Sequence, residues 1–289
     1  MSGLLIHASG SPAADGAILR VTPESAGWRY VGFEVLALPA GAVAQRETGD
    51  RELCVVVIAG AVEVRSRHGV WSHLGGRIDP WAGRPDGAYL PPETTVTIKA
   101  AGAGVGGGSD TRGPAAGAEV ALCWAPAPFG GAPACVLPGD ATEVETRGYG
   151  ALERFICPIL MGDREADSLL VCEVLTPAGH WSSYPPHRHD RDDPPRETVL
   201  EETYYHRMKP PGGFGLQCVY SDDRSLEEAV TFGDRDCVLV PRGYHTVSTP
   251  PGYDLYYLNV MAGPTRLWAV SNDPDHDWVL APQATNPST

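Results

Sequence analysis

Histidines gather in one short stretch of this chain, "HWSSYPPHRHD" (180–190). Three of the nine histidines in the 289-residue sequence fall within it. His187 and His189 are separated by a single residue, and side chains on a β-strand alternate between its two faces. If this stretch is a strand, both imidazoles project from the same face and can bind one metal ion.

Two residues further along the chain could complete such a site. Glu202 could supply a carboxylate from the next strand, and His245 an imidazole from a strand across a barrel. Three imidazoles and one carboxylate suit Zn, Mn, Fe, Co or Ni and leave coordination positions open for a substrate. The sequence therefore predicts one catalytic divalent metal ion per chain, held by His187, His189, Glu202 and His245.

A polar loop without metal is the simpler interpretation of an isolated H-x-H, and other histidines have less support as ligands. We interpret His180 as a surface loop residue and His276 as part of a turn near the C-terminus. His206 lies four residues beyond Glu202 and shares its strand face, which would place it near the metal or the substrate. We nevertheless favour the metal site over the polar loop. Glu202 and His245 could supply further ligands, and the two halves of the chain form a repeat in which only the C-terminal copy has these histidines.

The segments that must position these residues are short, apolar and rich in β-branched side chains. They include "CVVVIAGAVEV" (54–64), "TTVTIKA" (94–100), "EVALCW" (119–124), "SLLVCEVL" (168–175), "CVLVP" (237–241) and "DLYYLNVMAG" (254–263). Turns that contain many of the 34 glycines and 27 prolines separate them. Only "DDRSLEEAV" (222–230) suggests a turn or two of helix. This pattern predicts a mainly β fold of the sandwich or barrel type.

The two halves of the chain resemble each other. The matching pairs are "EVLALPAG" (34–41) with "EVLTPAG" (173–179), and "LPPETTVTIKAAG" (90–102) with "VPRGYHTVSTPPG" (240–252). The second pair is offset by 150 residues, and the same offset aligns Glu52 with Glu202. Matches that recur in the same order indicate two copies of one β-unit.

This repeat divides the chain into two β-domains. We predict an N-terminal domain over 1–135, a linker over 136–151 and a C-terminal domain over 152–289. The C-terminal copy has 12 extra residues, in the segment that holds the H-x-H. In the N-terminal copy Thr95 takes the place of His245, and Glu52 has no histidines to accompany it. We therefore predict that the N-terminal domain binds no metal.

Composition excludes several classes of partner. The formal net charge is −14 at pH 7, and the lysines and arginines are scattered, which argues against binding to nucleic acid or to an anionic membrane. The first residues lack a basic region followed by a long apolar run, and no stretch approaches the ~20 apolar residues that span a bilayer. We expect a cytoplasmic protein. Its seven cysteines contain no C-x-x-C pair and are expected to be reduced and buried.

The order H-x-H, glutamate and P-x-G-x-H resembles the metal-binding motif of the cupin superfamily. This resemblance implies a bicupin, with two β-sandwich or barrel domains of the double-stranded β-helix type. It also assigns the ligand roles to His187, His189, Glu202 and His245. The gap between His189 and Glu202 is longer than in many cupins, and Glu201 is a second possible carboxylate. We favour Glu202, because "EETYYH" resembles the family's paired glutamates, of which the second usually binds the metal.

Longer strings narrow the resemblance. They are "WSSYPPHRHD", "YYHRMKPPGGFGLQCVYSDDRSLEE", "VLVPRGYH" and "PGYDLYYLNVMAGPTRLW". These strings resemble the two-cupin sugar-acid isomerase family, in particular its members in myo-inositol catabolism. The resemblance implies an aldose–ketose isomerisation that converts 5-deoxy-D-glucuronate to 5-dehydro-2-deoxy-D-gluconate.

That chemistry matches the predicted site. A divalent ion with open positions can bind the aldehyde oxygen and the neighbouring hydroxyl, which acidifies the hydrogen at C2 and stabilises the enediolate. A base must then move a proton between C2 and C1. Tyr204 and His206 are the candidates, because they alternate inward with Glu202 on one strand face. Packing in the barrel core is the alternative role for Tyr204.

Other residues could line the substrate pocket. Tyr184, Gln217 and Tyr257 are candidates, and the substrate carboxylate calls for an arginine. Arg242 and Arg207 are both possible, whereas Arg188, the middle residue of the H-x-H, is expected to point outward.

The sequence also allows three other functions. One is the related isomerisation of 4-deoxy-5-keto-uronates in pectin catabolism, which uses the same ligands. The others are a cupin dioxygenase that uses Fe(II) and a sugar-binding or storage protein without activity. A small sugar acid is the expected partner in the favoured case. Self-association through sheet edges into a homo-oligomer is also possible.

Overall fold

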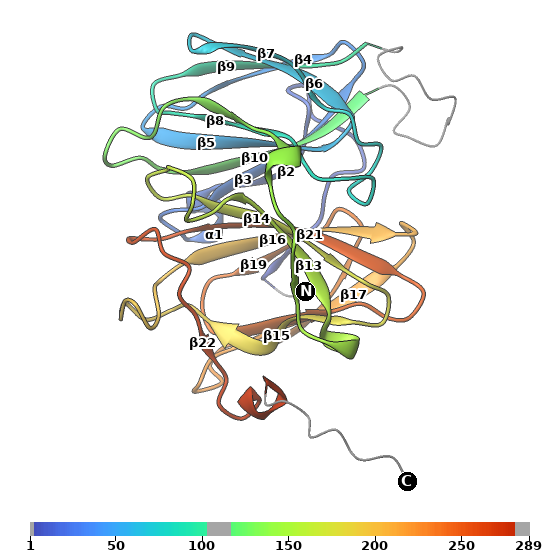
Figure 1. The fold of residues 1–289 in the computed structure, drawn as a ribbon, viewed down its shortest axis with the longest axis vertical. Coiled ribbons are helices and arrows are strands. Elements are labelled where there is room, and N and C mark those ends of the chain that lie inside the picture. The colour runs from blue at the N-terminus through green and yellow to red at the C-terminus, as the bar shows by residue number, and fades with distance from the viewer. Residues whose placement is uncertain (1–2, 103–116, 281–289) are drawn as a thin grey trace.

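The computed structural model describes residues 3–102 and 117–280 (Figure 1). Strands make up nearly all of its regular structure. The described residues contain one α-helix, α1 (Pro23–Ala26), and three short 3-10 helices, η1 (Gly139–Ala141), η2 (Gly150–Leu152) and η3 (Asp277–Leu280). The predicted mainly β fold is confirmed.

Two antiparallel sheets form the N-terminal barrel, at the top of Figure 1. The larger has the strand order β11-β8-β5-β10-β3-β2 and the smaller the order β4-β9-β6-β7. The bounds are β2 (Ala17–Val21), β3 (Gly32–Pro39), β4 (Val43–Glu47), β5 (Arg51–Ala59), β6 (Ala61–Ser66), β7 (Gly69–Gly75), β8 (Gly87–Leu90), β9 (Thr95–Ala100), β10 (Gly117–Pro126) and β11 (Cys135–Leu137). Buried apolar side chains such as Leu53, Val57 and Ile98 fill the space between the two sheets.

Two further antiparallel sheets form the C-terminal barrel. Their orders are β1-β19-β16-β21-β14-β13-β12 and β18-β17-β20-β15-β22. The bounds are β1 (Leu5–Ile6), β12 (Glu145–Arg147), β13 (Arg154–Leu160), β14 (Leu170–Thr176), β15 (Trp181–Arg188), β16 (Glu201–Lys209), β17 (Phe214–Tyr220), β18 (Glu227–Gly233), β19 (Cys237–Val240), β20 (Tyr244–Ser248), β21 (Asp254–Ala262) and β22 (Ser271–Asn272). Val219, Val247 and Met261 belong to its apolar core, which also contains Tyr204.

The chain passes from the N-terminal to the C-terminal barrel between β11, which pairs with β8, and β12, which pairs with β13. The domain bounds drawn from the sequence stay a prediction. One strand lies outside this simple division. β1 comes from the N-terminal end of the chain but pairs with β19, so that Leu5 lies opposite Val238 in the C-terminal barrel. The first residues therefore tie the second barrel to the first.

The valine-rich run in β5 explains the stacking of the two barrels. β5 is buried on both faces, as a nearly continuous apolar strand should be. Leu53, Val55 and Val57 face the N-terminal interior, whereas Cys54 and Val56 face the other barrel. Gly60 ends the strand with a φ of +80°, at a point where a Cβ would clash with the backbone of β10.

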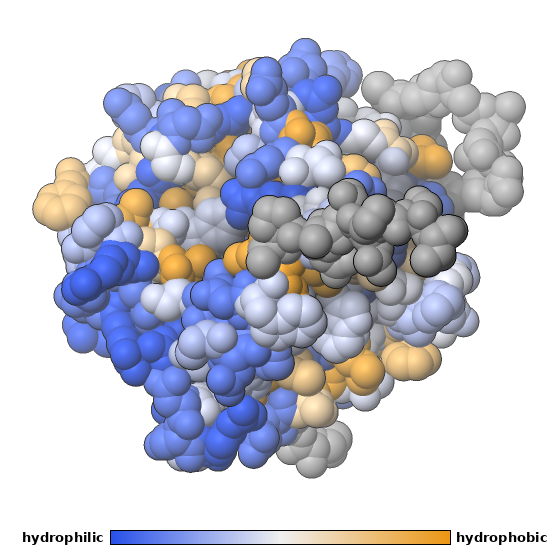
Figure 2. Space-filling view, turned by 60° about the horizontal axis from the view of Figure 1, so that its bottom comes forward, coloured by the Kyte–Doolittle hydropathy of each residue, from blue (hydrophilic) through white to orange (hydrophobic). Residues whose placement is uncertain are grey.

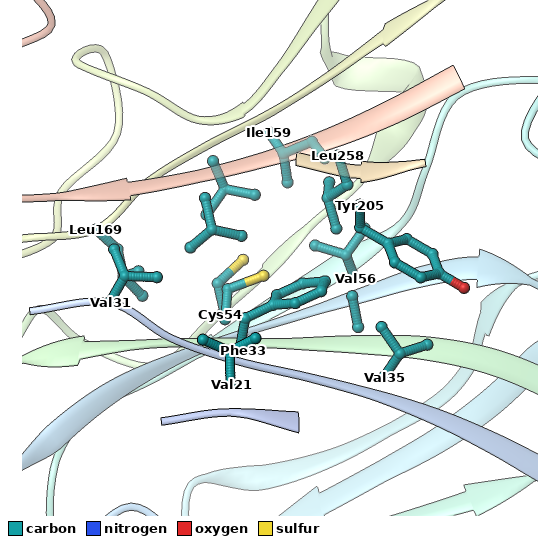
Figure 3. Close-up of a cluster of buried hydrophobic side chains, with 14 of the residues drawn as sticks. Val21, Val31, Phe33, Val35, Cys54, Val56, Ile159, Leu169, Tyr205 and Leu258 are labelled. Carbon is teal, nitrogen blue, oxygen red and sulfur yellow. The ribbon is translucent and has the colours of Figure 1, made fainter. Parts of the chain in front are cut away.

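A single apolar layer joins the two larger sheets. Phe33, Cys54 and Val56 of the N-terminal barrel meet Tyr205 and Leu258 of the C-terminal barrel in this layer (Figure 3). The rings of Phe33 and Tyr205 lie 5.8 Å apart. Because each fully buried side chain of this size contributes roughly 1.5–3 kcal/mol, this layer holds the barrels together as one unit.

Two glutamates, one from each barrel, bind backbone of the opposite barrel. The Glu52 carboxylate accepts hydrogen bonds from the backbone N–H groups of Asp167, Ser168 and Leu169 at 2.6–2.8 Å, and from the Tyr89 hydroxyl at 2.7 Å.

Glu201 makes the corresponding contacts in the other direction. Its carboxylate accepts hydrogen bonds from the backbone N–H groups of Arg29, Tyr30 and Val31 at 2.7–2.9 Å. Glu201 is thereby engaged in the contact between barrels and does not face the predicted metal site.

This geometry corrects the repeat alignment by one residue. In the structure Leu53 pairs with Leu90 on β8, as Glu202 pairs with Val240 on β19, so Glu52 corresponds to Glu201 and not to Glu202. A shift of one residue moves a side chain to the opposite face of a strand, which a sequence offset alone does not resolve.

Thr95, which the sequence repeat aligns with His245, is also one residue away from the inward position. Thr95 is exposed on β9, and the buried neighbours are Thr94 and Val96. Thr95 therefore does not occupy the inward position of His245, which is fully buried.

We expect Glu52→Ala to destabilise the chain strongly, because it would remove the acceptor of three buried donors and one partly buried donor. Such losses cost about 1–3 kcal/mol each when they are not relieved by water, so we expect the free energy of unfolding to fall by at least about 3 kcal/mol. Urea denaturation monitored by circular dichroism measures it.

The matched control is Glu63→Ala, since the Glu63 carboxylate is half-buried and, among the described residues, accepts hydrogen bonds from the side chains of Arg65 and Ser72. An unfolding midpoint of Glu52→Ala equal to that of the control would contradict the role assigned to Glu52.

The face of the molecule in Figure 2 carries mainly hydrophilic residues, with apolar residues in small separate areas among them. No helix within the described residues is long and apolar enough to cross a membrane. A cytoplasmic location and self-association stay predictions from the sequence.

Candidate metal centre and substrate cavity

Three of the predicted ligands converge inside the C-terminal barrel. The Nε2 atom of His189 lies 2.9 Å from Oε2 of Glu202, and Nε2 of His245 lies 3.1 Å from the same oxygen. All three side chains are buried, and their ligand atoms lie within 4.8 Å of one another. Among the described residues this is the one such group that could hold a metal ion.

The other nitrogen of each ring is held by the backbone. Nδ1 of His189 lies 2.9 Å from the Leu200 carbonyl oxygen, and Nδ1 of His245 lies 3.2 Å from that of Gly243. Because a carbonyl can only accept, each Nδ1 donates to it, and each Nε2 is directed at Glu202. Two ring nitrogens and a carboxylate directed at one another form a donor set for a cation.

The electrostatics of the cluster follow from its burial. Burial would raise the pKa of Glu202, but the interactions with His189 and His245 outweigh it and bring this pKa to about 2. Burial lowers the pKa of His189, but the bond to Glu202 outweighs this effect and leaves the pKa raised. The Nε2 atom of His245 is buried and has no hydrogen bond of good geometry. These donors therefore fit a divalent ion.

His187 lies beside this group. It pairs directly opposite His245 across β15 and β20, and the two rings are 4.5 Å apart. Its ring is 6.3 Å from that of His189. Burial, together with His245 and His189, lowers the pKa of His187 well below its usual range, so the ring is neutral. His187 thus borders the cluster as a neutral imidazole, without being one of its three converging ligands.

The long segment of chain between His189 and Glu202 does not move Glu202 away from the metal ligands. The backbone N–H of Leu200 donates to the His189 carbonyl at 2.9 Å, next to the bond from the His189 ring to Leu200. Within the intervening loop, Glu197 is buried and accepts hydrogen bonds from the N–H groups of Asp190 and Arg191, each at 3.0 Å. The extra residues therefore form a closed loop, and the chain enters β16 with Glu202 facing inward.

A cavity of about 400 Å³ opens onto the cluster. Its lining includes His187, Glu202 and three of the predicted site residues, Tyr184, Tyr204 and Tyr257. A volume in this range suits a small-molecule ligand.

Four hydroxyl groups form a connected set beside the ligands. The Tyr204 hydroxyl lies 3.0 Å from Oγ of Ser183, which lies 3.5 Å from the Tyr257 hydroxyl. Oγ of Ser182 lies 2.6 Å from the Tyr257 hydroxyl. Burial and the charge of Glu202 raise the pKa of Tyr204 well above its usual range. This set can relay a proton along its hydrogen bonds.

Three other predicted site residues do not line this cavity. His206 is fully buried, stacks on Phe232 with ring centroids 3.6 Å apart, and lies 3.1 Å from the Gln217 side chain. Burial lowers the pKa of His206 to about 3. Gln217 is buried with it in the barrel core, and Arg242 donates to Oγ of Ser225 at the surface.

Neither of the other arginines considered from the sequence reaches the cavity. Arg207 pairs with Glu119 and Asp234. Arg188 is buried and pairs with Glu197 and Asp222.

Two arginines that were not predicted from the sequence also line the cavity, Arg147 and Arg154. Arg154 is the first residue of β13, and its only signal is a charged residue at the start of the apolar run "RFICPIL". Arg147 is bound by both oxygens of Glu145 and lies over the Trp268 ring at 4.9 Å. The rim is completed by the C-terminal segment, since the Tyr149 hydroxyl donates to the Val279 carbonyl at 2.7 Å.

Two stacked double-sheet barrels, of which one holds an inward-facing His–His–Glu cluster, define a bicupin. Solved structures agree with this class. A mutant of Bacillus subtilis oxalate decarboxylase superposes with a TM-score of 0.61 at 13% identity, covering 94% of this chain and 80% of that one. At this identity the likeness shows the fold alone.

More similar proteins identify the family. Residues 5–279 match the KduI/IolB family. The 5-deoxy-glucuronate isomerase of Geobacillus thermodenitrificans is 48% identical over 95% of both chains, and that of Bacillus subtilis is 40% identical over 97% of this chain and 99% of its own. An IolB-like protein of Salmonella typhimurium superposes with a TM-score of 0.88 at 41% identity, covering 96% of this chain and 99% of that one. The chain belongs to the KduI/IolB family, which confirms the resemblance inferred from its sequence.

Proposed function

We propose that this chain is a metal-dependent isomerase that converts 5-deoxy-D-glucuronate to 5-dehydro-2-deoxy-D-gluconate. The observation that carries the proposal is the buried His–His–Glu cluster beside a cavity whose lining includes Glu202, Tyr204 and two arginines. Such a cavity suits a substrate that has two neighbouring oxygens for a metal ion and a carboxylate for an arginine. The names of relatives at 40–48% identity support the same reaction.

His189, Glu202 and His245 would hold one divalent ion, with His187 as the fourth ligand. The donor set accepts Zn, Mn, Fe, Co or Ni. When bound, the ion would supply a Lewis acid that polarises the C1 carbonyl and the C2 hydroxyl of the sugar acid.

Side chains of the cavity would handle the protons on oxygen. In the reaction a hydrogen moves from C2 to C1, and the hydroxyl proton passes from O2 to O1. We assign the transfer between the oxygens to Tyr204, whose hydroxyl can donate to one oxygen while it accepts from the other. Ser183 and Tyr257 extend this path by hydrogen bonds. His206, which the sequence also offered as the base that moves a proton between C2 and C1, lies behind this surface on Phe232, and we assign it no part in the reaction.

Parallel assays with two substrates test the proposal. We expect faster turnover of 5-deoxy-D-glucuronate than of the 4-deoxy-5-keto-uronate from pectin catabolism, and the same rate with and without oxygen. Faster turnover of the pectin-derived substrate would assign the chain to the related isomerase reaction. A requirement for oxygen would assign it to the dioxygenases.

We expect one metal equivalent per chain. The N-terminal interior presents Leu53 and Val96 where the C-terminal barrel has ligands, and neither side chain can bind an ion. Elemental analysis of purified protein after dialysis measures the content. Two equivalents per chain would contradict the assignment of a single site.

A further inference from the structure

We propose that Arg154 binds the terminal carboxylate of the substrate and so orients the sugar acid with its other end at the metal ligands. This inference rests on the proposed function, because it assigns a residue to the substrate of that reaction. It replaces Arg242 and Arg207 as candidates for this role.

The Arg154 side chain is a cation to which no carboxylate of the described residues is bound. Its guanidinium donates to the Leu152 carbonyl at 3.1 Å, and within the described part of the chain it forms no ion pair. Arg147, its neighbour in the cavity, is already bound at 2.7 and 2.8 Å by Glu145. Of the two cavity arginines, Arg154 therefore has donors free for a ligand.

The site holds the guanidinium inside the cavity. Gly148, which also lines the cavity, has a φ of +79°, and a Cβ there would lie 2.1 Å from the Leu152 carbonyl oxygen and 2.9 Å from a terminal nitrogen of Arg154. The missing side chain thus leaves room for the Leu152 carbonyl and for the guanidinium that donates to it. Burial lowers the pKa of Arg154, and the hydroxyls of Tyr257 and Tyr204 are close enough to affect it. A partly buried, unpaired arginine gains from an anionic partner, and its planar fork matches a carboxylate.

Two different groups of the cavity can bind the two ends of the substrate. Among the described residues, Glu202 is the one carboxylate in the lining, and it belongs to the metal cluster, which would hold the two neighbouring oxygens of the sugar acid through the ion. Arg154 offers an unpaired cation to the carboxylate. The occupant is therefore a hydroxy aldehyde with a carboxylate remote from its carbonyl, and a neutral sugar of the same length should bind less well.

Binding of two ligands that cannot isomerise tests the inference. The first is 5-deoxy-glucuronate reduced to the alcohol at C1, and the second is its neutral counterpart with a hydroxymethyl group in place of the carboxylate. Calorimetry is carried out on metal-loaded wild-type chain and on Arg154→Gln, Arg154→Lys, Arg242→Gln and the exposed control Arg65→Gln. Equal metal content and unfolding temperature are required of each variant.

For Arg154→Gln we expect affinity for the reduced acid to fall about 100-fold, with little change for the neutral ligand, because two charge-assisted hydrogen bonds are lost. Arg154→Lys should recover part of the loss and Arg65→Gln should match the wild type. A loss of less than three-fold in Arg154→Gln, a larger loss in Arg242→Gln, or wild-type chain that binds both ligands equally would overturn the inference. A wild type that binds the reduced acid through Arg154 but does not isomerise 5-deoxy-D-glucuronate would instead reject the proposed function.

Discussion

His245→Ala is expected to lower turnover by at least about 10³-fold and to remove most of the bound metal. His245 supplies one of three converging ligands, and the polarisation it supports is worth several kcal/mol in the transition state. The side chain is fully buried, so water can replace it only in part. Steady-state kinetics and elemental analysis of the same preparation measure the two effects together.

A histidine at the surface provides the matched control. His73 is exposed on β7 and has a φ of +64°. Asparagine is the control substitution, because it tolerates this backbone conformation. His73→Asn should keep both activity and metal. His245→Ala with full metal content and wild-type turnover would rule out the proposed centre.

Tyr204→Phe is expected to lower kcat by about 10²–10⁴-fold while the metal content stays unchanged. The substitution removes the hydroxyl that faces the cavity and contacts Ser183, but leaves His189, Glu202 and His245 in place. KM should change much less than kcat, because the phenol acts in the transfer of a proton and not in holding the carboxylate.

Tyr205→Phe separates this effect from a general loss of packing. Tyr205 is the next residue on β16, is equally buried, and points to the opposite face, where its hydroxyl contacts Glu119 at 2.9 Å. It should cost stability but leave kcat near the wild-type value. If both variants lose kcat equally, or if Tyr204→Phe retains full turnover, Tyr204 has no part in the chemistry.

The ligand set could be predicted from the sequence because metal binding needs rare side chains at fixed spacing. His189, Glu202 and His245 stood out by type and by order, and the structure brings them together. The strands could also be predicted, since β-branched runs between glycine and proline turns have few other solutions.

The face of the strand on which a residue lies could not be predicted from the sequence alone. Glu52 and Thr95 were aligned with Glu202 and His245, but the strand pairings place Glu52 at the contact between barrels and Thr95 at the surface. Side chains on strands alternate with period two, so an alignment error of one residue reverses the assignment.

Only the tertiary structure could show which side chains surround the metal ligands. Tyr204 and His206 share a strand face, yet Tyr204 lines the cavity while His206 packs behind it on Phe232. Arg154 enters the cavity because β13 lies at its edge, whereas Arg242, close to a ligand in sequence, turns to the surface. The sequence by itself determined which side chains could bind a metal. Only the packing of strands distant in sequence decided which tyrosine and which arginine reach the substrate, because a cavity is formed between elements and not within one.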